Sequence, residues 1–183
     1  MLWFRAPQKV YFKKGCMPVA LDELGTVMGK KKCFIVTDTF LYKNGYVAPI
    51  EEKLDQLGIQ HTCFYDVAPD PNLSSALKGA QAMRLFEPDC IIALGGGSVM
   101  DCAKISGLMA TNPGELWDYV QGGTGGRRAF EHDPLPLVAI TTTAGTGSEV
   151  DAGGVITNPE TREKVGIGHP GCFPKLAIVD PEL

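Results

Sequence analysis

The sequence lacks several features that would point to other classes of protein. No apolar run approaches the ~20 residues of a membrane-spanning helix, and the first five residues, MLWFR, are too short a run for a signal peptide. The net charge of −4 leaves no excess of positive charge to attract nucleic acid or an anionic membrane. We therefore expect a cytoplasmic protein whose partners include neither nucleic acid nor a membrane.

Metal-site and disulfide patterns are also missing. The three histidines, His61, His132 and His169, show no H-x-x-x-H spacing, so we expect no metal site built from them. None of the six cysteines forms a C-x-x-C pair, and several lie in apolar runs such as CFIV at 33–36. In a chain long enough to have its own core, we interpret them as reduced thiols acting as small hydrophobic side chains.

The composition indicates an ordinary globular domain with unusual loops. The 183 residues are 44% hydrophobic and 21% charged, which is typical of a chain that buries a real core. Glycine is abundant, with 22 residues in 183 against a usual share of ~7%. Because these glycines are concentrated in a few loops, we look for function there.

Strand-like and helix-like segments alternate along the chain. β-Branched and apolar runs predict strands at 32–38, 61–67, 89–94 and 137–142. Helical periodicity predicts helices at 47–57, after residue 73, and directly after the glycines at 95–97. Strands separated by helices call for parallel pairing, so we predict an α/β fold, a Rossmann-like sheet with helices on both faces, over residues 1–183.

Two other segments are expected to be less regular. Residues 10–15 (VYFKKG) are interpreted as an amino-terminal β-hairpin, and residues 114–134, which include GGTGGRR, as a loose surface loop. Arg127 and Arg128 could hold an anion in that loop, although a solvated loop is the safer interpretation. Beyond Gly145 the chain is expected to be extended and rich in glycine.

The strongest local signal is IIALGGGSVMD at residues 91–101. A buried strand runs through three glycines into a helix, so unpaired backbone N–H groups at the helix start favour a phosphate. Without side chains, Gly96 and Gly97 would let a diphosphate approach the main chain. Ser98 and Asp101 also match an S-x-x-D capping box. Ser98 could therefore contact a ligand, cap the helix or do both, whereas Asp101 is interpreted as structural. The motif is not the standard G-x-G-x-x-G fingerprint, because Met100 replaces the last glycine.

Two further loops should meet this one. Asp38 ends a predicted strand, where a carboxylate can accept both hydroxyls of an adenosine ribose, although a capping or turn role is equally open. TTTAGTGSE at 141–149 follows the last predicted strand. Because the carboxyl ends of parallel strands share one edge of a sheet, we expect all three loops to converge there.

Four strings carry a resemblance to a known family: VTDTFLYKNGY, IIALGGGSVMDCAK, TTTAGTGSEV and LAIVDPEL. In this order they resemble the amino-terminal domain of the iron-containing (group III) alcohol dehydrogenases, which have a dehydroquinate synthase-like fold. The first two look especially like the alcohol dehydrogenase half of bifunctional aldehyde-alcohol dehydrogenases. The resemblance covers nearly the whole chain.

The resemblance implies NAD as coenzyme and hydride transfer between a primary alcohol and an aldehyde. It implies these contacts: Gly96, Gly97 and Ser98 with the diphosphate, Asp38 with the adenosine ribose, Asp70 beside the adenine, Thr143 and Thr146 along the cleft, and Lys164 near the nicotinamide ribose. It also implies a divalent metal, iron or zinc, held by one aspartate and three histidines of a helical domain that would begin after DPEL. We therefore expect no metal ligands among these 183 residues and no alcohol oxidation by this chain alone, and we assign no catalytic residue.

Other functions remain open at this stage. A glycerol dehydrogenase or a dehydroquinate synthase-like enzyme would use the same scaffold, and a non-catalytic nucleotide-binding module would also suit the missing metal ligands. A domain parted from a helical neighbour should expose an apolar face, so we also expect self-association into a homo-oligomer.

Overall fold

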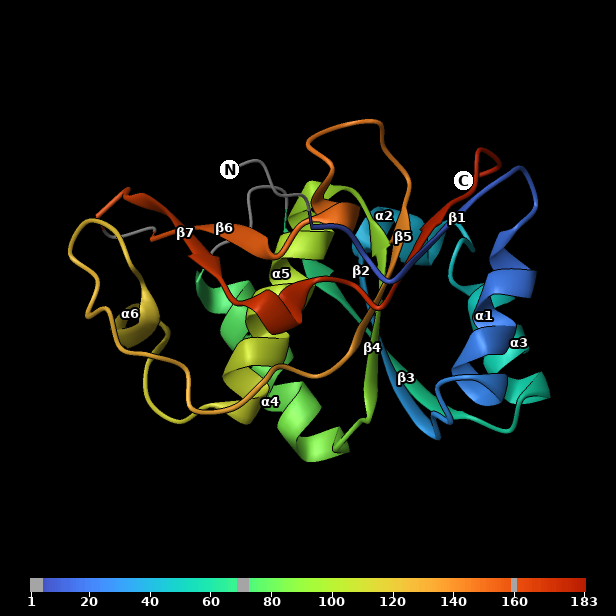
Figure 1. The fold of residues 1–183 in the computed structure, drawn as a ribbon, viewed down its shortest axis with the longest axis horizontal. Helices are drawn as coiled ribbons and strands as arrows, with labels where there is room; N and C mark the ends of the chain where they lie inside the picture. The colour runs from blue at the N-terminus through green and yellow to red at the C-terminus, as the bar shows by residue number, and fades with distance from the viewer. Residues whose placement is uncertain (1–4, 69–72, 159–160) are drawn as a thin grey trace.

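The computed structural model describes residues 5–68, 73–158 and 161–183 (Figure 1). It confirms the predicted α/β class, with a six-stranded parallel sheet in the order β1-β8-β5-β4-β2-β3. The strands of this sheet are β1 (Lys9–Phe12), β2 (Lys32–Asp38), β3 (Gln60–Val67), β4 (Cys90–Gly95), β5 (Leu137–Thr141) and β8 (Leu176–Val179). A separate antiparallel hairpin pairs β6 (Gly153–Thr157) with β7 (Lys164–Gly168).

Helices cover both faces of the sheet, as predicted. They are α1 (Met17–Thr26), α2 (Thr39–Lys43), α3 (Ala48–Gln56), α4 (Leu73–Phe86), α5 (Gly97–Thr111) and α6 (Leu116–Tyr119), with short 3₁₀ turns η1 (Ser148–Val150) and η2 (Pro170–Cys172). Figure 1 shows α1 and α3 on one side of the sheet and α4 and α5 on the other. Within the described residues no helix is long and apolar enough to cross a membrane.

Strand β4 shows why the sheet is buried on both sides. Its six residues are all buried. Ile92 and Leu94 pack with α1 and α3, whereas Ile91 and Ala93 pack with α4 and α5. Because successive side chains of a strand point to opposite faces, a continuous apolar run suits a strand that is covered twice.

The strand order creates a crevice between β2 and β4. The chain leaves β2 for β3 on one side, and it leaves β4 for β5 on the other. The connections of these two neighbouring strands therefore diverge at their carboxyl ends, which is where open α/β sheets bind ligands. Asp38 ends β2, and Gly95 ends β4.

The amino-terminal hairpin prediction is wrong. Strand β1 pairs parallel with β8, with Lys9 opposite Leu176 and Phe12 opposite Val179, so it forms an edge of the main sheet. The buried carboxylate of Asp180, just after β8, accepts hydrogen bonds from the backbone N–H groups of Gly15 (2.8 Å) and Met17 (3.0 Å). These contacts draw the turn after β1 to the end of β8, a pairing partner far away in sequence.

The segment at 114–134 is also less loose than predicted. It contains α6, where Leu116 and Tyr119 are buried. Tyr119 stacks on Phe130 with ring centroids 4.5 Å apart, and the Arg128 guanidinium lies over the Tyr119 ring. Arg128 also forms an ion pair with Glu131, so its charge is engaged within the segment. Its apolar residues were too sparse in sequence to show a period.

All six cysteines carry free thiols, as predicted, and five of them are buried. Burial raises the pKa of Cys63, Cys102 and Cys172 to about 12 in each case, which keeps these thiols protonated near neutral pH. They therefore act as small core side chains.

We predict that Asp180→Asn lowers the free energy of unfolding by about 2 kcal/mol, because the amide leaves a buried N–H donor facing an NH₂ group. Burial raises the pKa of the Asp180 carboxyl, but its backbone N–H partners, Met17 first, lower it overall. The carboxylate therefore stabilises the fold at pH values above the unfolded-state pKa of ~3.9. This stabilisation is lost as the pH falls through the pKa of Asp180 in the folded state, which is lower. Urea unfolding of the parent and of Asp180→Asn measures the difference between their free energies of unfolding. This difference should be constant above about pH 5 and should shrink below about pH 4. A difference in the free energy of unfolding that does not change with pH would contradict the stabilising role of the Asp180 carboxylate.

Candidate functional site

A cleft opens at the carboxyl edge of the sheet, where the predicted loops converge. One cavity of ≈ 840 Å³ is lined by residues from β2, the β4–α5 turn and the loop after β5, including Asp38, Gly96 and Thr142. A second cavity of ≈ 670 Å³ lies toward the β6–β7 hairpin and is lined by Thr146 and Lys164, among others. Both cavities share three lining residues: Gly97, Ser98 and Thr143. The two cavities therefore meet at the glycine turn.

The turn from β4 into α5 depends on glycine. Gly95 has φ +153°, and a Cβ built on it would lie 2.6 Å from Val99 Cγ2. The first hydrogen bonds of α5 run from the N–H groups of Val99 (3.0 Å) and Met100 (3.1 Å) to Gly96 O. The amides of Gly97 and Ser98 precede these bonds, at the positive end of the helix. Gly97 and Ser98 both line the cleft, so we expect an anion in it to reach these amides.

The threonine loop packs directly against this turn. A Cβ built on Gly96 would lie 3.1 Å from Thr143 Oγ1, and one on Gly97 would lie 3.5 Å from Thr146 Oγ1. Thr141 Oγ1 donates to Thr143 O (3.0 Å), which shapes the loop where it leaves β5. A larger residue at 96 would force the loop away, so the small residue also sets the width of the cleft.

The structure shows one of the two roles left open for Asp38. Its Oδ1 accepts a hydrogen bond from Leu41 N (2.9 Å), so it caps α2. It is half-buried and lines the larger cavity with Gly96 and Gly97. The capping role is shown, while contact with a ribose stays a prediction.

The predicted capping box of Ser98 and Asp101 is wrong. The N-cap of α5 is Gly96, and Ser98 lies within the first turn. The Asp101 carboxylate instead accepts hydrogen bonds from Ser148 Oγ (2.7 Å) and Val155 N (2.9 Å). Asp101 is thus structural, as interpreted, but its partners are remote in sequence.

Lys104 is a buried residue that sequence reasoning missed. Its side chain is 1% exposed. Its ammonium donates to Ser148 O (2.7 Å), Asp151 Oδ1 (2.5 Å) and Gly153 O (2.9 Å). A lysine inside the apolar stretch CAKIS is the signal that could have identified it, because such a charge needs partners when buried.

The remaining predicted positions divide in two groups. Lys164 begins β7 and lines the smaller cavity with Thr146. Asp70 lies outside the described residues. The structure therefore brings together every predicted site residue that it describes.

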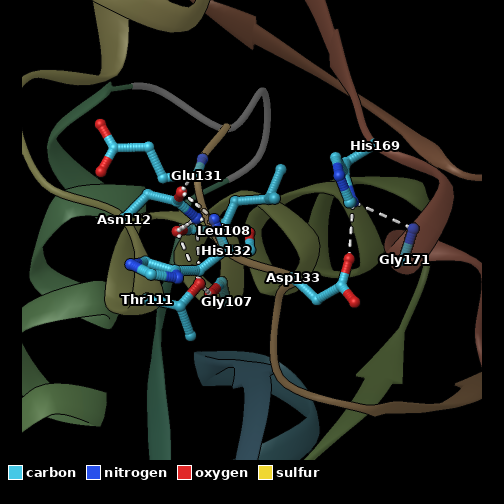
Figure 2. A network of polar contacts seen from close by, with 9 residues as sticks. All are labelled: Gly107, Leu108, Thr111, Asn112, Glu131, His132, Asp133, His169 and Gly171. Atoms are coloured by element: carbon cyan, nitrogen blue, oxygen red, sulfur yellow. Dashed lines mark hydrogen bonds and ion pairs between the residues drawn. The ribbon is translucent and has the colours of Figure 1, made fainter. Parts of the chain in front are cut away.

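Two of the three histidines, His169 and His132, make local hydrogen bonds, whereas His61 Nε2 is buried without a hydrogen-bond partner among the described residues and lies 3.6 Å from Asp55 Oδ1. In Figure 2, His169 Nδ1 accepts a hydrogen bond from Gly171 N (3.0 Å) and lies 3.8 Å from Asp133 Oδ1. The backbone of His132 bonds to the Asn112 side chain at the carboxyl end of α5 (Figure 2). Across residues 5–68, 73–158 and 161–183, no group of three or more His, Cys, Asp or Glu residues is placed to hold a metal ion.

Comparison with known proteins gives a consistent result. Residues 7–181 match the family model described as "Iron-containing alcohol dehydrogenase". The chain is 40% identical over 189 aligned residues to the bifunctional aldehyde-alcohol dehydrogenase AdhE of Escherichia coli, covering 100% of this chain and 21% of that protein. It is 37% identical to the NAD-dependent methanol dehydrogenase of Bacillus methanolicus, covering 90% and 42%.

Solved structures with the same fold include a sulfoacetaldehyde reductase from Bifidobacterium kashiwanohense in complex with NAD⁺. The TM-score is 0.88 at 33% identity, over 100% of this chain and 47% of that one. A 1,3-propanediol oxidoreductase gives a TM-score of 0.89 at 34% identity, over 100% and 46%. The chain therefore spans less than half of each of these relatives.

We predict that Gly95→Ala lowers the free energy of unfolding by about 3 kcal/mol, because it combines a backbone conformation suited to glycine with a clash against Val99. Gly97→Ala is the matched control. Its Cβ meets only an ordinary contact, so its stability should stay within about 1 kcal/mol of the parent. Chemical denaturation measures both. Equal stability of the two variants would contradict the assigned geometry of the turn.

Proposed function

Because the chain belongs to the iron-containing alcohol dehydrogenase family, we propose that it is the NAD-binding part of an enzyme that interconverts a primary alcohol and an aldehyde. The observation that carries the proposal is the convergence of three loops on the open amino end of α5. The cleft has two lobes of ≈ 840 and ≈ 670 Å³, volumes typical of small-molecule sites. Two linked lobes suit a dinucleotide, with one nucleotide in each.

The diphosphate binds at the junction of the lobes. The backbone N–H groups of Gly97 and Ser98 donate hydrogen bonds to the diphosphate, and the positive end of the α5 dipole attracts its negative charge. Gly97 lets phosphate oxygens approach the main chain, and the Ser98 hydroxyl adds a donor. The Asp101 carboxylate, one turn further along α5, is held by hydrogen bonds from Ser148 Oγ and Val155 N.

The adenosine end occupies the larger lobe. Asp38 accepts the ribose hydroxyls there while its Oδ1 keeps the cap of α2. A carboxylate at this position repels a 2′-phosphate, which favours NAD over NADP. The apolar lining near it, including Val67 and Ala68, suits the adenine base. Asp70 retains its proposed place beside the adenine.

The nicotinamide end occupies the smaller lobe. Thr143 and Thr146 line the passage into it, and Lys164 approaches the ribose from β7. When bound, NAD supplies the ring that accepts or donates hydride. The residues of this chain hold and orient that ring and restrict access of water to it.

The divalent metal of the family is not fitted by the described residues, so we derive no step through it. We propose that its ligands lie outside these 183 residues, and that this chain alone binds NAD weakly without oxidising alcohols. Self-association and a cytoplasmic location also stay predictions.

Gly97→Ala tests the diphosphate site. The added methyl group should keep phosphate oxygens from the Ser98 amide and lower NAD affinity by about tenfold or more, as measured by isothermal titration calorimetry. Gly122→Ala is the control, because its Cβ meets nothing within 4 Å and Gly122 lies in neither lobe of the cleft. Parent-like affinity in Gly97→Ala would refute the diphosphate site.

Asp38→Asn tests the ribose site. Asparagine keeps an oxygen acceptor for Leu41 N but removes the charge that repels a 2′-phosphate. We expect the ratio of NADP to NAD affinity to rise by about tenfold in titration calorimetry. An unchanged ratio would refute the ribose role of Asp38.

A further inference from the structure

The smaller lobe of the cleft depends on a hairpin that lies outside the main sheet. Strands β6 and β7 pair only with each other among the described strands, with Thr157 opposite Lys164. This hairpin carries Lys164, Gly166 and Gly168 along the cavity wall. No ladder hydrogen bonds of the main sheet fix its position, so other contacts must do so.

Helix α5 provides those contacts through two ionisable side chains one turn apart. Lys104 donates all three of its hydrogen bonds to the segment 148–153, which leads into β6. Asp101 accepts a hydrogen bond from Ser148 Oγ, at the start of this segment, and another from Val155 N, within β6 itself. The backbones also approach closely, because a Cβ built on Gly154 would lie 3.2 Å from Asp101 O.

These contacts are costly to remove. A buried ammonium is stable only when its donors are satisfied, and Lys104 has three acceptors for its three donors. Its partner Asp151 is half exposed, with 50% of its side chain accessible, whereas only 1% of the Lys104 side chain is accessible. The segment 148–153 is therefore attached to α5 through a buried ammonium.

The same helix thus serves both lobes. Its amino end faces the diphosphate site, and one to two turns later it fixes the wall that carries Lys164. We propose that Lys104 and Asp101 are positioning residues, which align the hairpin with the diphosphate site so that both halves of the dinucleotide can be bound at once. This inference rests on the proposed function, but it makes a separate claim about how the two halves are coupled.

The test compares two ligands that differ in the lobes they need. ADP carries only the adenosine and the diphosphate, which bind in the larger lobe and at the helix end, whereas NADH also needs the hairpin wall. We expect Lys104→Met to weaken NADH binding by about tenfold while ADP affinity stays within about twofold of the parent. The fluorescence emission maximum of bound NADH should also shift toward that of free NADH, because the β6–β7 hairpin would no longer be held beside the nicotinamide ring.

Two further variants keep the test decisive. Lys53→Met removes another lysine–aspartate contact (2.6 Å to Asp22), between α3 and α1 and outside the cleft, and should leave both affinities unchanged. Ser148→Ala removes one hydroxyl donor to Asp101. It should weaken NADH binding by about threefold while ADP affinity stays unchanged. This variant carries the test if Lys104→Met does not fold.

The outcomes separate the two claims. Equal loss of ADP and NADH affinity in these variants, or no loss of either, would overturn the positioning role. A parent protein that fails to bind NADH would overturn the proposed function itself, and with it this inference.

Discussion

The structure depends on how strand β4 ends. Gly95 allows the chain to leave a fully buried strand with φ +153°, so that α5 starts at once and its first amides face the carboxyl edge of the sheet. A residue with a side chain there would strike Val99 and move the helix start. The threonine loop rests on the next two glycines, and the β6–β7 hairpin is attached to the same helix. The first two turns of α5 and the glycines before them therefore contact the threonine loop and the β6–β7 hairpin.

Electrostatics at this end is arranged to leave the anion site available. Two ionisable side chains lie within two turns of it, yet both are engaged with the segment between the threonine loop and β6. The Asp101 carboxylate accepts hydrogen bonds from two neutral donors, and the positive charge of Lys104 is paired with Asp151. The open donors at the helix start are then main-chain amides and the Ser98 hydroxyl, which suits binding of a phosphate at short range.

The local elements could be predicted from the sequence because their signals are local. Strand 32–38 has the predicted bounds, since a run of β-branched and apolar residues ends in Asp38. The convergence of three loops followed from parallel topology alone. Contacts between remote residues could not be predicted: β1 pairs with β8, where Asp180 binds the backbone after β1, and Lys104 binds the segment that leads into the hairpin. Both are buried charges whose partners lie far away in sequence.

The central claim is that the main-chain amides at the start of α5 bind the diphosphate of a nicotinamide dinucleotide. Amide NMR shifts of the ¹⁵N-labelled chain during titration with NAD test this directly. The account predicts that the amide signals of Gly97 and Ser98 shift most and saturate with the same dissociation constant as signals from the loop after β5. Saturable shifts confined to another region, with these two amides unmoved, would contradict it.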